Sequence, residues 1–345
     1  MKKQLLVASV LVGLLLLGFS GSAWAKQPSD APPVSPPLND PQPATAPPVD
    51  PLLGLSFAQV APDGAPLYHH PGDTAPARMI SKGFVFIDLT KTQTTVFQGE
   101  LWYQLATGEY IPAKYLTPYA PSQFRGLEWL SAPTKAFAWV LADTRVSLTP
   151  GTNPEPEARR LTRYQTLVIQ EEQMVDAVKW YRIGKTGWVS QYRVAVVTPS
   201  PRPERVGLTD KWIEVNLYEQ TLAAYEGDTL VYATLISSGL PGWETDQGLF
   251  RIWSKARLTP MSGHEGAPDF YSLDDVMWTQ FFNNDTALHG AYWHDGFGAP
   301  HSHGCVNLSP QDALWLYEWT TPPAGQANWA MPTASDPGTW VWVHE

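Results

Sequence analysis

The chain has 345 residues, of which 43% are hydrophobic, and a formal net charge of −10 at pH 7. This length is enough for two or three separate hydrophobic cores. The acidic balance and the lack of a basic run argue against nucleic acid as a partner. A single cysteine excludes an intramolecular disulfide, so stability must come from the cores.

Residues 1–25 have the pattern of a secretory signal peptide. Two lysines near the start precede an apolar run from Leu5 to Phe19, and an A-x-A cleavage site follows at 23–25. We therefore expect export to the cell envelope, in the periplasm or at the cell wall, as a chain that begins at Lys26. An uncleaved membrane anchor is the alternative, since the apolar run is long for a signal core. The absence of a cysteine near the cleavage site predicts that there is no lipid anchor.

Residues 26–53 are rich in proline and contain almost no large apolar side chains. Such a segment cannot bury enough surface to fold, and proline keeps it extended. We interpret it as a disordered linker that spaces the folded part from the membrane or carries it into the wall. A proline-rich ligand is the alternative interpretation, but the sequence identifies no partner protein.

A repeat of β character follows the linker. The motif W-Y-x-[LI] at 102–105 recurs at 180–183, and the [YW]-[IV] pair after each copy keeps the same spacing. Each copy predicts a hairpin that turns at a glycine and has aromatic residues on one face. The pattern resembles bacterial Src-homology-type barrels. We therefore predict two small β-barrel modules, at 54–119 and 134–200, that either bind the wall or act as a rigid spacer.

A proline cluster at 199–203 marks the next boundary, and short strand patterns follow it closely. They lie at 212–217, 221–225, 230–237 and 248–253. Gly227-Asp228 is a hairpin signal between the second and third patterns. Together they predict an antiparallel sheet. We expect residues 205–345 to form a separate domain that folds without the repeats.

Two further segments frame the site of that domain. Residues 259–276 are polar, contain glycine and show few periodic apolar positions, which predicts a flexible flap carrying Tyr271 as a substrate contact. Near the end of the chain, Ser309 is a helix N-cap followed by Pro310, and the helix is expected to run to about Trp319. A closing strand is predicted at 340–343.

The stretch 289–308 contains the only cysteine, Cys305, and four of the eight histidines, at 289, 294, 301 and 303. An imidazole beside a thiol can deprotonate it for nucleophilic attack. One alternative is a cysteine buried for packing, although the glycine-hinged, polar context argues against it. Another is a metal site formed by His301, His303 and Cys305 with a further histidine.

This stretch resembles the active-site signature of the L,D-transpeptidases, bacterial cysteine enzymes that crosslink peptidoglycan. That signature is a His, a spacer, Ser/Thr-His-Gly-Cys, an apolar residue and then Arg or Asn. Here it consists of His289 and residues 302–307, with Asn307 where many members carry Arg. The similarity extends through roughly residues 205–345, although Asp-Gln replaces the more usual Pro-Thr before a G-x-F turn.

The resemblance implies a mainly β fold, with a β-sandwich catalytic domain and a short helix after the cysteine, and no cofactor or metal. It implies that Cys305 is the nucleophile and His289 the base, oriented by the Gly290 carbonyl. Backbone N–H groups at Gly304 and Cys305 are expected to hold the oxyanion. His303 completes the catalytic set by shaping the pocket and the turn.

The resemblance also implies a substrate, the peptidoglycan stem peptide, which Ser302, Asn307 and Tyr271 are expected to contact. The thiolate attacks the carbonyl between the third stem residue and the terminal D-alanine. D-alanine leaves, and the thioester passes to an amine of a neighbouring stem. Water as the acceptor gives an L,D-carboxypeptidase or amidase instead. A non-catalytic wall-binding protein is the alternative from another class.

The positions of the histidines give each a different expected role. His289 ends an apolar strand pattern, which is a rigid platform for a base. His294 and His301 flank a flexible glycine-rich segment, so we expect both to face solvent. Pairing with His289 is expected to lower the pKa of the Cys305 thiol from its ordinary value of about 8.5.

Overall fold

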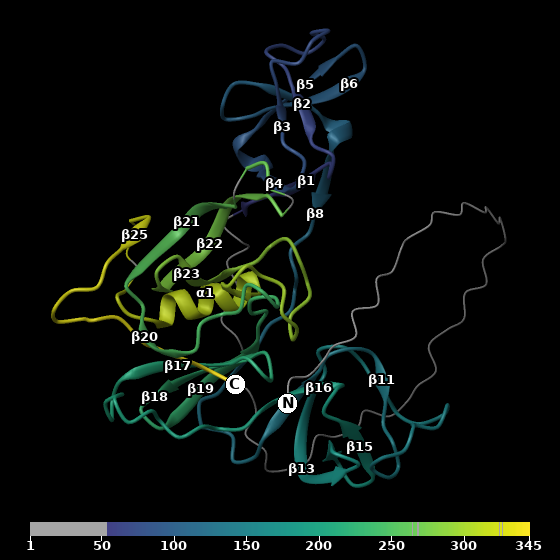
Figure 1. Ribbon diagram of the computed structural model, residues 1–345, viewed down its shortest axis with the longest axis vertical. Coiled ribbons are helices and arrows are strands. Elements are labelled where there is room, and N and C mark those ends of the chain that lie inside the picture. Colours follow the sequence, from purple (N-terminus) through teal and green to yellow (C-terminus); the bar gives the residue numbers. More distant parts are fainter. Residues whose placement is uncertain (1–53, 264, 268, 324, 326) are drawn as a thin grey trace. The chain divides into compact units, whose positions relative to one another are not determined.

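The computed structural model describes residues 54–263, 265–267, 269–323, 325 and 327–345. The predicted signal peptide and linker lie outside the described residues. The described part is built mainly of strands, as the sequence predicts, and contains one α-helix, α1 (Figure 1). No helix within these residues has the length and apolar character needed to span a membrane.

One sheet of the C-terminal part has the strand order β20-β26-β17-β18-β19-β9. Its strands are β20 (Gly248–Arg251), β26 (Trp340–His344), β17 (Lys211–Asn216), β18 (Thr221–Glu226), β19 (Thr229–Leu235) and β9 (Leu127–Glu128). The hairpin predicted at Gly227-Asp228 is confirmed, since β18 and β19 pair antiparallel across it. The closing strand β26 pairs parallel with β17.

A second sheet carries the histidine and cysteine motif and has the order β24-β23-β22-β4-β1-β8, with β21 also paired to β22 and β25 to β21. Its strands are β24 (Val306–Leu308), β23 (Thr286–Gly290), β22 (Tyr271–Asn283), β4 (Phe84–Asp88), β1 (Phe57–Val60), β8 (Leu116–Tyr119), β21 (Ser254–Ser262) and β25 (Trp329–Ala330). The sheet therefore joins strands from both ends of the described chain.

The segment predicted as a flexible flap is mostly strand. β21 continues to Ser262 and β22 begins at Tyr271, so only residues 263–270 connect the two strands. β21 and β22 remain paired as far as Ser262 and Ser272. The sequence did not predict this hairpin, because the ends of its strands are polar and do not alternate between apolar and polar residues.

Helix α1 (Pro310–Trp319) follows the cysteine as predicted. The Ser309 hydroxyl accepts the N–H of Asp312 at 3.1 Å, and Pro310 occupies the first turn. A proline there sacrifices no helical hydrogen bond, because the first N–H groups of a helix have no partner within it. The start of α1 is thus fixed two residues after β24 ends.

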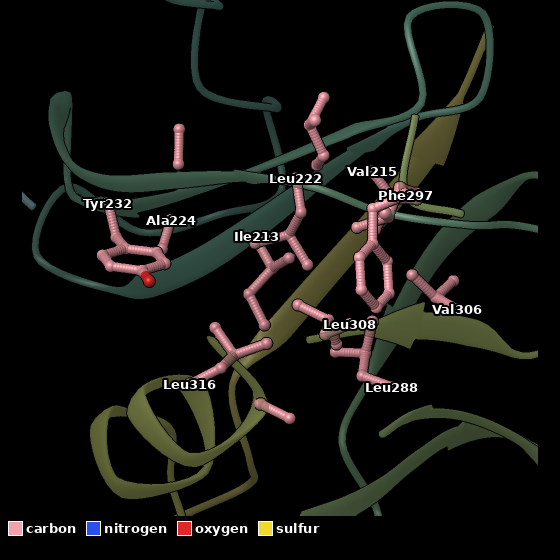
Figure 2. Packing of buried hydrophobic residues seen from close by; sticks show 14 of the residues in the cluster. Ile213, Val215, Leu222, Ala224, Tyr232, Leu288, Phe297, Val306, Leu308 and Leu316 are labelled. Atoms are coloured by element: carbon pink, nitrogen blue, oxygen red, sulfur yellow. The ribbon is translucent and has the colours of Figure 1, made fainter. Parts of the chain in front are cut away.

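The core of the C-terminal part lies between the two sheets, with α1 packed into it (Figure 1). The Trp315 ring of α1 stacks on Tyr232 of β19 with centroids 3.9 Å apart. Figure 2 shows side chains from both sheets and the helix meeting there, among them Ile213, Leu222, Leu288, Leu308 and Leu316. This packing holds β23 and β24, which flank the motif, against a buried core.

The preceding residues form further small sheets. β2 (Ala65–Leu67) pairs with β3 (Arg78–Ile80), and β5 (Gln93–Phe97), β6 (Glu100–Gln104) and β7 (Tyr110–Pro112) form a third sheet. Between 134 and 200, the strands are β10 (Phe137–Val140), β13 (Thr166–Val175), β14 (Val178–Ile183), β15 (Gly187–Ser190) and β16 (Val194–Val197), with a pair β11 (Thr144–Arg145) and β12 (Arg160–Leu161). The two repeat hairpins are confirmed as β6–β7 and β14–β15. Closure of either module into a barrel stays a prediction.

The C-terminal part shares sheets and core with what precedes it. β4 pairs parallel with β22, and β9 pairs with β19. Phe57 stacks on Tyr292 with ring centroids 3.5 Å apart. Trp129 belongs to the same apolar cluster as the core of the C-terminal sheets. A chain of residues 205–345 alone would lack these contacts, and its independent folding stays a prediction.

Candidate active site

The two ends of the motif lie on neighbouring parallel strands. Leu288 of β23 is paired with Val306 of β24, and His289 is paired with Asn307. Cys305 immediately precedes β24, so the backbone pairing brings its turn beside the end of β23. Residues 291–305 form the connection between these strands.

The Cys305 thiol is partly buried and lies 3.8 Å from the carbonyl oxygen of Asp285, to which it can donate. Burial raises the pKa of this thiol to about 11; the nearby Asp285 charge adds to the rise, and a backbone contact at Ala287 opposes it. The thiol is therefore protonated at neutral pH. This differs from the expected lowering of its pKa, because burial disfavours the thiolate.

His289 is only 2% exposed and its Nδ1 lies 3.4 Å from the Gly290 carbonyl oxygen. A carbonyl can only accept, so this contact assigns the ring proton to Nδ1 and leaves Nε2 with a lone pair. Burial lowers the pKa of His289 to about 4, which keeps the ring neutral at pH 7. A neutral imidazole with an available Nε2 is in the state needed to accept a proton.

One cavity of about 420 Å³ brings the sequence-predicted side chains together. Six of them line it: Tyr271, His289, Ser302, His303, Cys305 and Asn307. These residues come from β22, from β23, from the segment that leads into β24 and from β24 itself. The two glycines named from sequence act through their backbones. The arrangement places a thiol and a neutral base in one solvent-connected site.

His303 lines this cavity and contacts two aromatic rings. Its ring centroid is 4.6 Å from that of Trp243 and 5.1 Å from that of Tyr271, and Tyr271 is stacked on it. Asp269 approaches the His303 Nε2 at 3.7 Å. The His303 imidazole thus packs against aromatic rings and stays partly exposed to the cavity.

Ser302 organises the turn before the cysteine. Its hydroxyl donates to the Cys305 carbonyl at 2.5 Å and accepts the Gly304 N–H at 3.1 Å. Gly304 has φ of +122°, a conformation that favours glycine. Because the Gly304 N–H already has a partner, it can reach a substrate oxygen only if the Ser302 bond is released or shared.

Thr245 supports the same turn and was not found from the sequence. Its buried hydroxyl donates to the Gly304 carbonyl at 2.8 Å and accepts the Gly239 N–H at 3.0 Å. An isolated threonine sixty residues before the cysteine carries no local pattern that would identify it. Trp293, whose ring centroid is 5.6 Å from that of His289, also lines the cavity and lies within the motif stretch itself.

The expectation that His294 faces solvent is wrong. Its side chain is 6% exposed and its ring lies 4.2 Å from that of His301, centroid to centroid. Burial lowers the pKa of His294 to about 3, with the neighbouring histidines adding to the effect. The glycines around it permit a tight loop that folds the ring inward. His301, by contrast, is exposed as expected.

Among the described residues, no three His, Cys, Asp or Glu side chains are grouped so that they could hold a metal ion. The alternating His301, His303 and Cys305 therefore do not converge on one point in this conformation. The chemistry that the cavity can support with its own groups is proton transfer from a thiol to an imidazole, followed by nucleophilic attack.

The chain is similar to a known enzyme family. The sequence model of the YkuD family, the L,D-transpeptidase catalytic domain, matches residues 210–343. Residues 210–343 are thus similar to the L,D-transpeptidase catalytic domain. The matched span contains β17 to β25, most of β26, the cavity residues of β22 to β24 and helix α1.

Similar proteins cover the chain in part. A putative L,D-transpeptidase of Bacillus subtilis, YciB, is 29% identical over 121 residues, which are 31% of this chain and 59% of that protein. The chain thus spans less than two thirds of this relative's length.

Solved structures of L,D-transpeptidases also match part of the chain, between 39% and 64% of it in three examples. They include a cysteine-to-serine mutant of the Enterococcus faecium L,D-transpeptidase, which is 24% identical, covers 39% of this chain and 50% of its own and has a TM-score of 0.31. An L,D-transpeptidase of Stackebrandtia nassauensis is 26% identical over 41% of this chain and 58% of its own, with a TM-score of 0.29. One from Mycobacterium smegmatis is 17% identical over 64% and 90%, with a TM-score of 0.34.

Proposed function

We propose that this protein is an exported cysteine L,D-transpeptidase that crosslinks peptidoglycan stem peptides. The observation that supports the proposal most strongly is that Cys305 and a neutral, buried His289 line one cavity in a domain of this family. The first step follows from the protonation states of these two groups. Because the thiol is protonated and His289 neutral, the proton must move to His289 Nε2 as the sulfur attacks.

The acylation step forms a bond between Cys305 Sγ and the carbonyl carbon that joins the third stem residue to D-alanine. The carbonyl oxygen becomes an oxyanion, which we assign to the Cys305 N–H, since the Gly304 N–H is donated to Ser302. When the tetrahedral intermediate collapses, the C–N bond breaks. The D-alanine amine leaves with the proton from His289, and a thioester remains on Cys305.

The second step depends on the acceptor. An amine of a neighbouring stem attacks the thioester, gives up a proton through His289 and forms the crosslink, which restores the thiol. Tyr271, Ser302 and Asn307 lie where they can contact the acyl donor. Hydrolysis by water uses the same groups and gives L,D-carboxypeptidase activity instead.

The products of purified muropeptides separate these outcomes. The chain from Lys26 is incubated with disaccharide tetrapeptides, and the products are weighed by mass spectrometry. Transpeptidation predicts dimers formed with release of one D-alanine each. Tripeptides alone identify a carboxypeptidase, and unchanged substrate refutes both activities. Cys305→Ala is the control, and it should produce neither product.

We also propose that the protein acts outside the cytoplasm, with residues 1–25 removed. This rests on the signal-peptide pattern and on the location of a peptidoglycan substrate. N-terminal sequencing of the protein from the envelope fraction should begin at Lys26. Recovery of an intact Met1 end there would show that the segment is retained as an anchor, and recovery only from the cytoplasm would refute export.

A further inference from the structure

The side chain of His294 contacts that of the cavity-lining residue Asn307. Its Nδ1 accepts the backbone N–H of Gly296 at 3.1 Å. Its other nitrogen, Nε2, is 2.9 Å from the side-chain amide of Asn307. His294 is 6% exposed and Asn307 is 1% exposed, so both side chains are shielded from bulk water. Both ring nitrogens therefore have fixed partners.

The Gly296 contact determines where the ring proton lies. A backbone N–H can only donate, so Nδ1 carries no proton and the neutral ring must carry it on Nε2. An Nε2–H requires an acceptor. If Asn307 presented its NH₂ group to it, two donors would face each other at 2.9 Å. The amide oxygen of Asn307 satisfies the contact, and the two ends of an amide are assigned by such networks.

The same half-turn of the Asn307 amide changes which of its two ends lacks a hydrogen-bond partner. With NH₂ toward His294, Asn307 Oδ1 is buried and has no hydrogen-bond partner. With Oδ1 toward His294, the NH₂ group takes that buried place and is the end without a partner in the protein, on a residue that lines the cavity. The Asn307 backbone cannot rearrange, because its N–H and its carbonyl are each bonded to Ser237 at 2.9 Å. Only the amide orientation is variable.

We propose that His294 is a positioning residue that holds the Asn307 amide with its NH₂ group facing the catalytic cavity, where it donates to an oxygen of the acyl-donor stem peptide. This inference rests on the proposed function for the identity of the ligand, but not for the orientation. Asn307 lines the cavity together with Cys305 and His289. A buried donor without a partner is costly, and a substrate carbonyl or carboxylate would supply the missing acceptor.

The reverse orientation would present an oxygen to the substrate oxygen and weaken binding. His294 is thus coupled to the substrate through one amide and does not act on the thiol. Its loss should affect the interaction with the acyl donor, mainly as a higher KM. It should leave the reactivity of Cys305 toward a small alkylating agent unchanged.

Two substitutions separate the two ring contacts. In His294→Gln the side-chain NH₂ stands close to the place of Nε2 and can still donate to Asn307. In His294→Asn the side-chain oxygen replaces Nδ1 and still accepts from Gly296, but nothing reaches Asn307. We expect His294→Gln to keep kcat/KM on tetrapeptides within about threefold, and His294→Asn to lower it about tenfold or more, the effect of one lost hydrogen bond in a desolvated site.

The iodoacetamide rate at Cys305 should be equal in both variants and the wild type. An equal loss of kcat/KM in both variants, or no loss in either, overturns the proposal. A loss of alkylation that parallels the loss of turnover also overturns it, because His294 would then act on the thiol or the fold.

The orientation has a readout that needs no substrate. In protein labelled with ¹⁵N-histidine, the two ring nitrogens of His294 should show the Nε2–H tautomer at pH 7. An Nδ1–H tautomer or an imidazolium refutes the orientation, whatever the activity. If the wild type leaves muropeptides unchanged but His294 shows Nε2–H, the proposed function fails while the positioning of Asn307 stands.

Discussion

His289 lies opposite Asn307 in the parallel pairing of β23 with β24. The backbone register therefore sets the distance between the base and the strand that begins just after Cys305. Both strands pack against helix α1 and the apolar core shown in Figure 2. His289 and Cys305, supported in this way, need no ligand to bring them together.

The reactivity of Cys305 should depend on pH in an unusual range. Burial raises the pKa of its thiol to about 11, so little thiolate is present at pH 7. We expect the iodoacetamide rate to keep rising beyond pH 9, whereas an ordinary thiol levels off above its pKa of about 8.5. A cysteine-containing peptide is the reference. A plateau reached near neutral pH would show a thiolate–imidazolium pair.

The buried histidines should make the fold sensitive to acid. The pKa of His294 is lowered to about 3, whereas an unfolded histidine titrates near 6.5. Between these values the unfolded chain binds a proton that the folded chain does not, so the free energy of unfolding falls as pH falls. The loss from this one group is a few kcal/mol, since each pKa unit is worth about 1.4 kcal/mol.

Urea unfolding of the wild type and His294→Gln between pH 6.5 and 4.5 measures this term. Asp312, whose pKa burial raises, acts in the opposite direction, so the difference between the two proteins is the useful quantity. The variant should lose less stability per pH unit. Equal slopes would mean that His294 is protonated in the folded state.

Lys255 should be a large single contributor to stability at the end of helix α1. Its buried Nζ donates to three carbonyls at and just after the end of α1, those of Tyr317, Thr320 and Pro322, at 2.6, 3.0 and 2.9 Å. Lys255→Met leaves these acceptors without that donor. We expect a loss of about 2–4 kcal/mol in the free energy of unfolding.

Lys185→Met is the matched control for Lys255, because it removes an exposed lysine from a turn. Its effect should stay within about 0.5 kcal/mol. Denaturant unfolding at pH 7 measures both variants. If the two proteins have the same midpoint, the three carbonyls find other partners and the Lys255 contact is not important for stability.

Removal of the preceding residues should destabilise the catalytic part. A chain of residues 203–345 lacks β4 beside β22 and Phe57 on Tyr292. It also lacks the Gly126 N–H that binds Asp312 of α1 at 2.8 Å. We therefore expect aggregation or a clearly lower thermal midpoint than for residues 54–345. A monodisperse 203–345 chain with an unchanged midpoint would restore the expectation drawn from the sequence.

Local signals in the sequence predicted the elements that they specify directly. Ser309 and Pro310 mark the start of α1 because capping and the fixed proline φ are properties of those residues. The hairpin at Gly227 was equally visible. The inward fold of His294 and the support from Thr245 depend on contacts distant in sequence. No local pattern encodes them.

The protonation states of Cys305 and His289 could not be predicted from the sequence either. Proximity in the motif suggested a thiol activated by an imidazole. The structure shows that burial dominates both groups, raising the pKa of Cys305 and lowering that of His289. Desolvation depends on the packing around each group, which residue spacing does not reveal.

The most direct test of Cys305 as the nucleophile and His289 as its base is the mass of the intact protein during reaction with a stem tetrapeptide. The wild type should gain the mass of the peptide less D-alanine, and peptide mapping should locate the adduct on Cys305. In His289→Gln the adduct should form about 10²–10⁴-fold more slowly, the usual effect of losing a general base. An adduct on another residue, turnover by Cys305→Ala, or an unchanged rate in His289→Gln would contradict this mechanism.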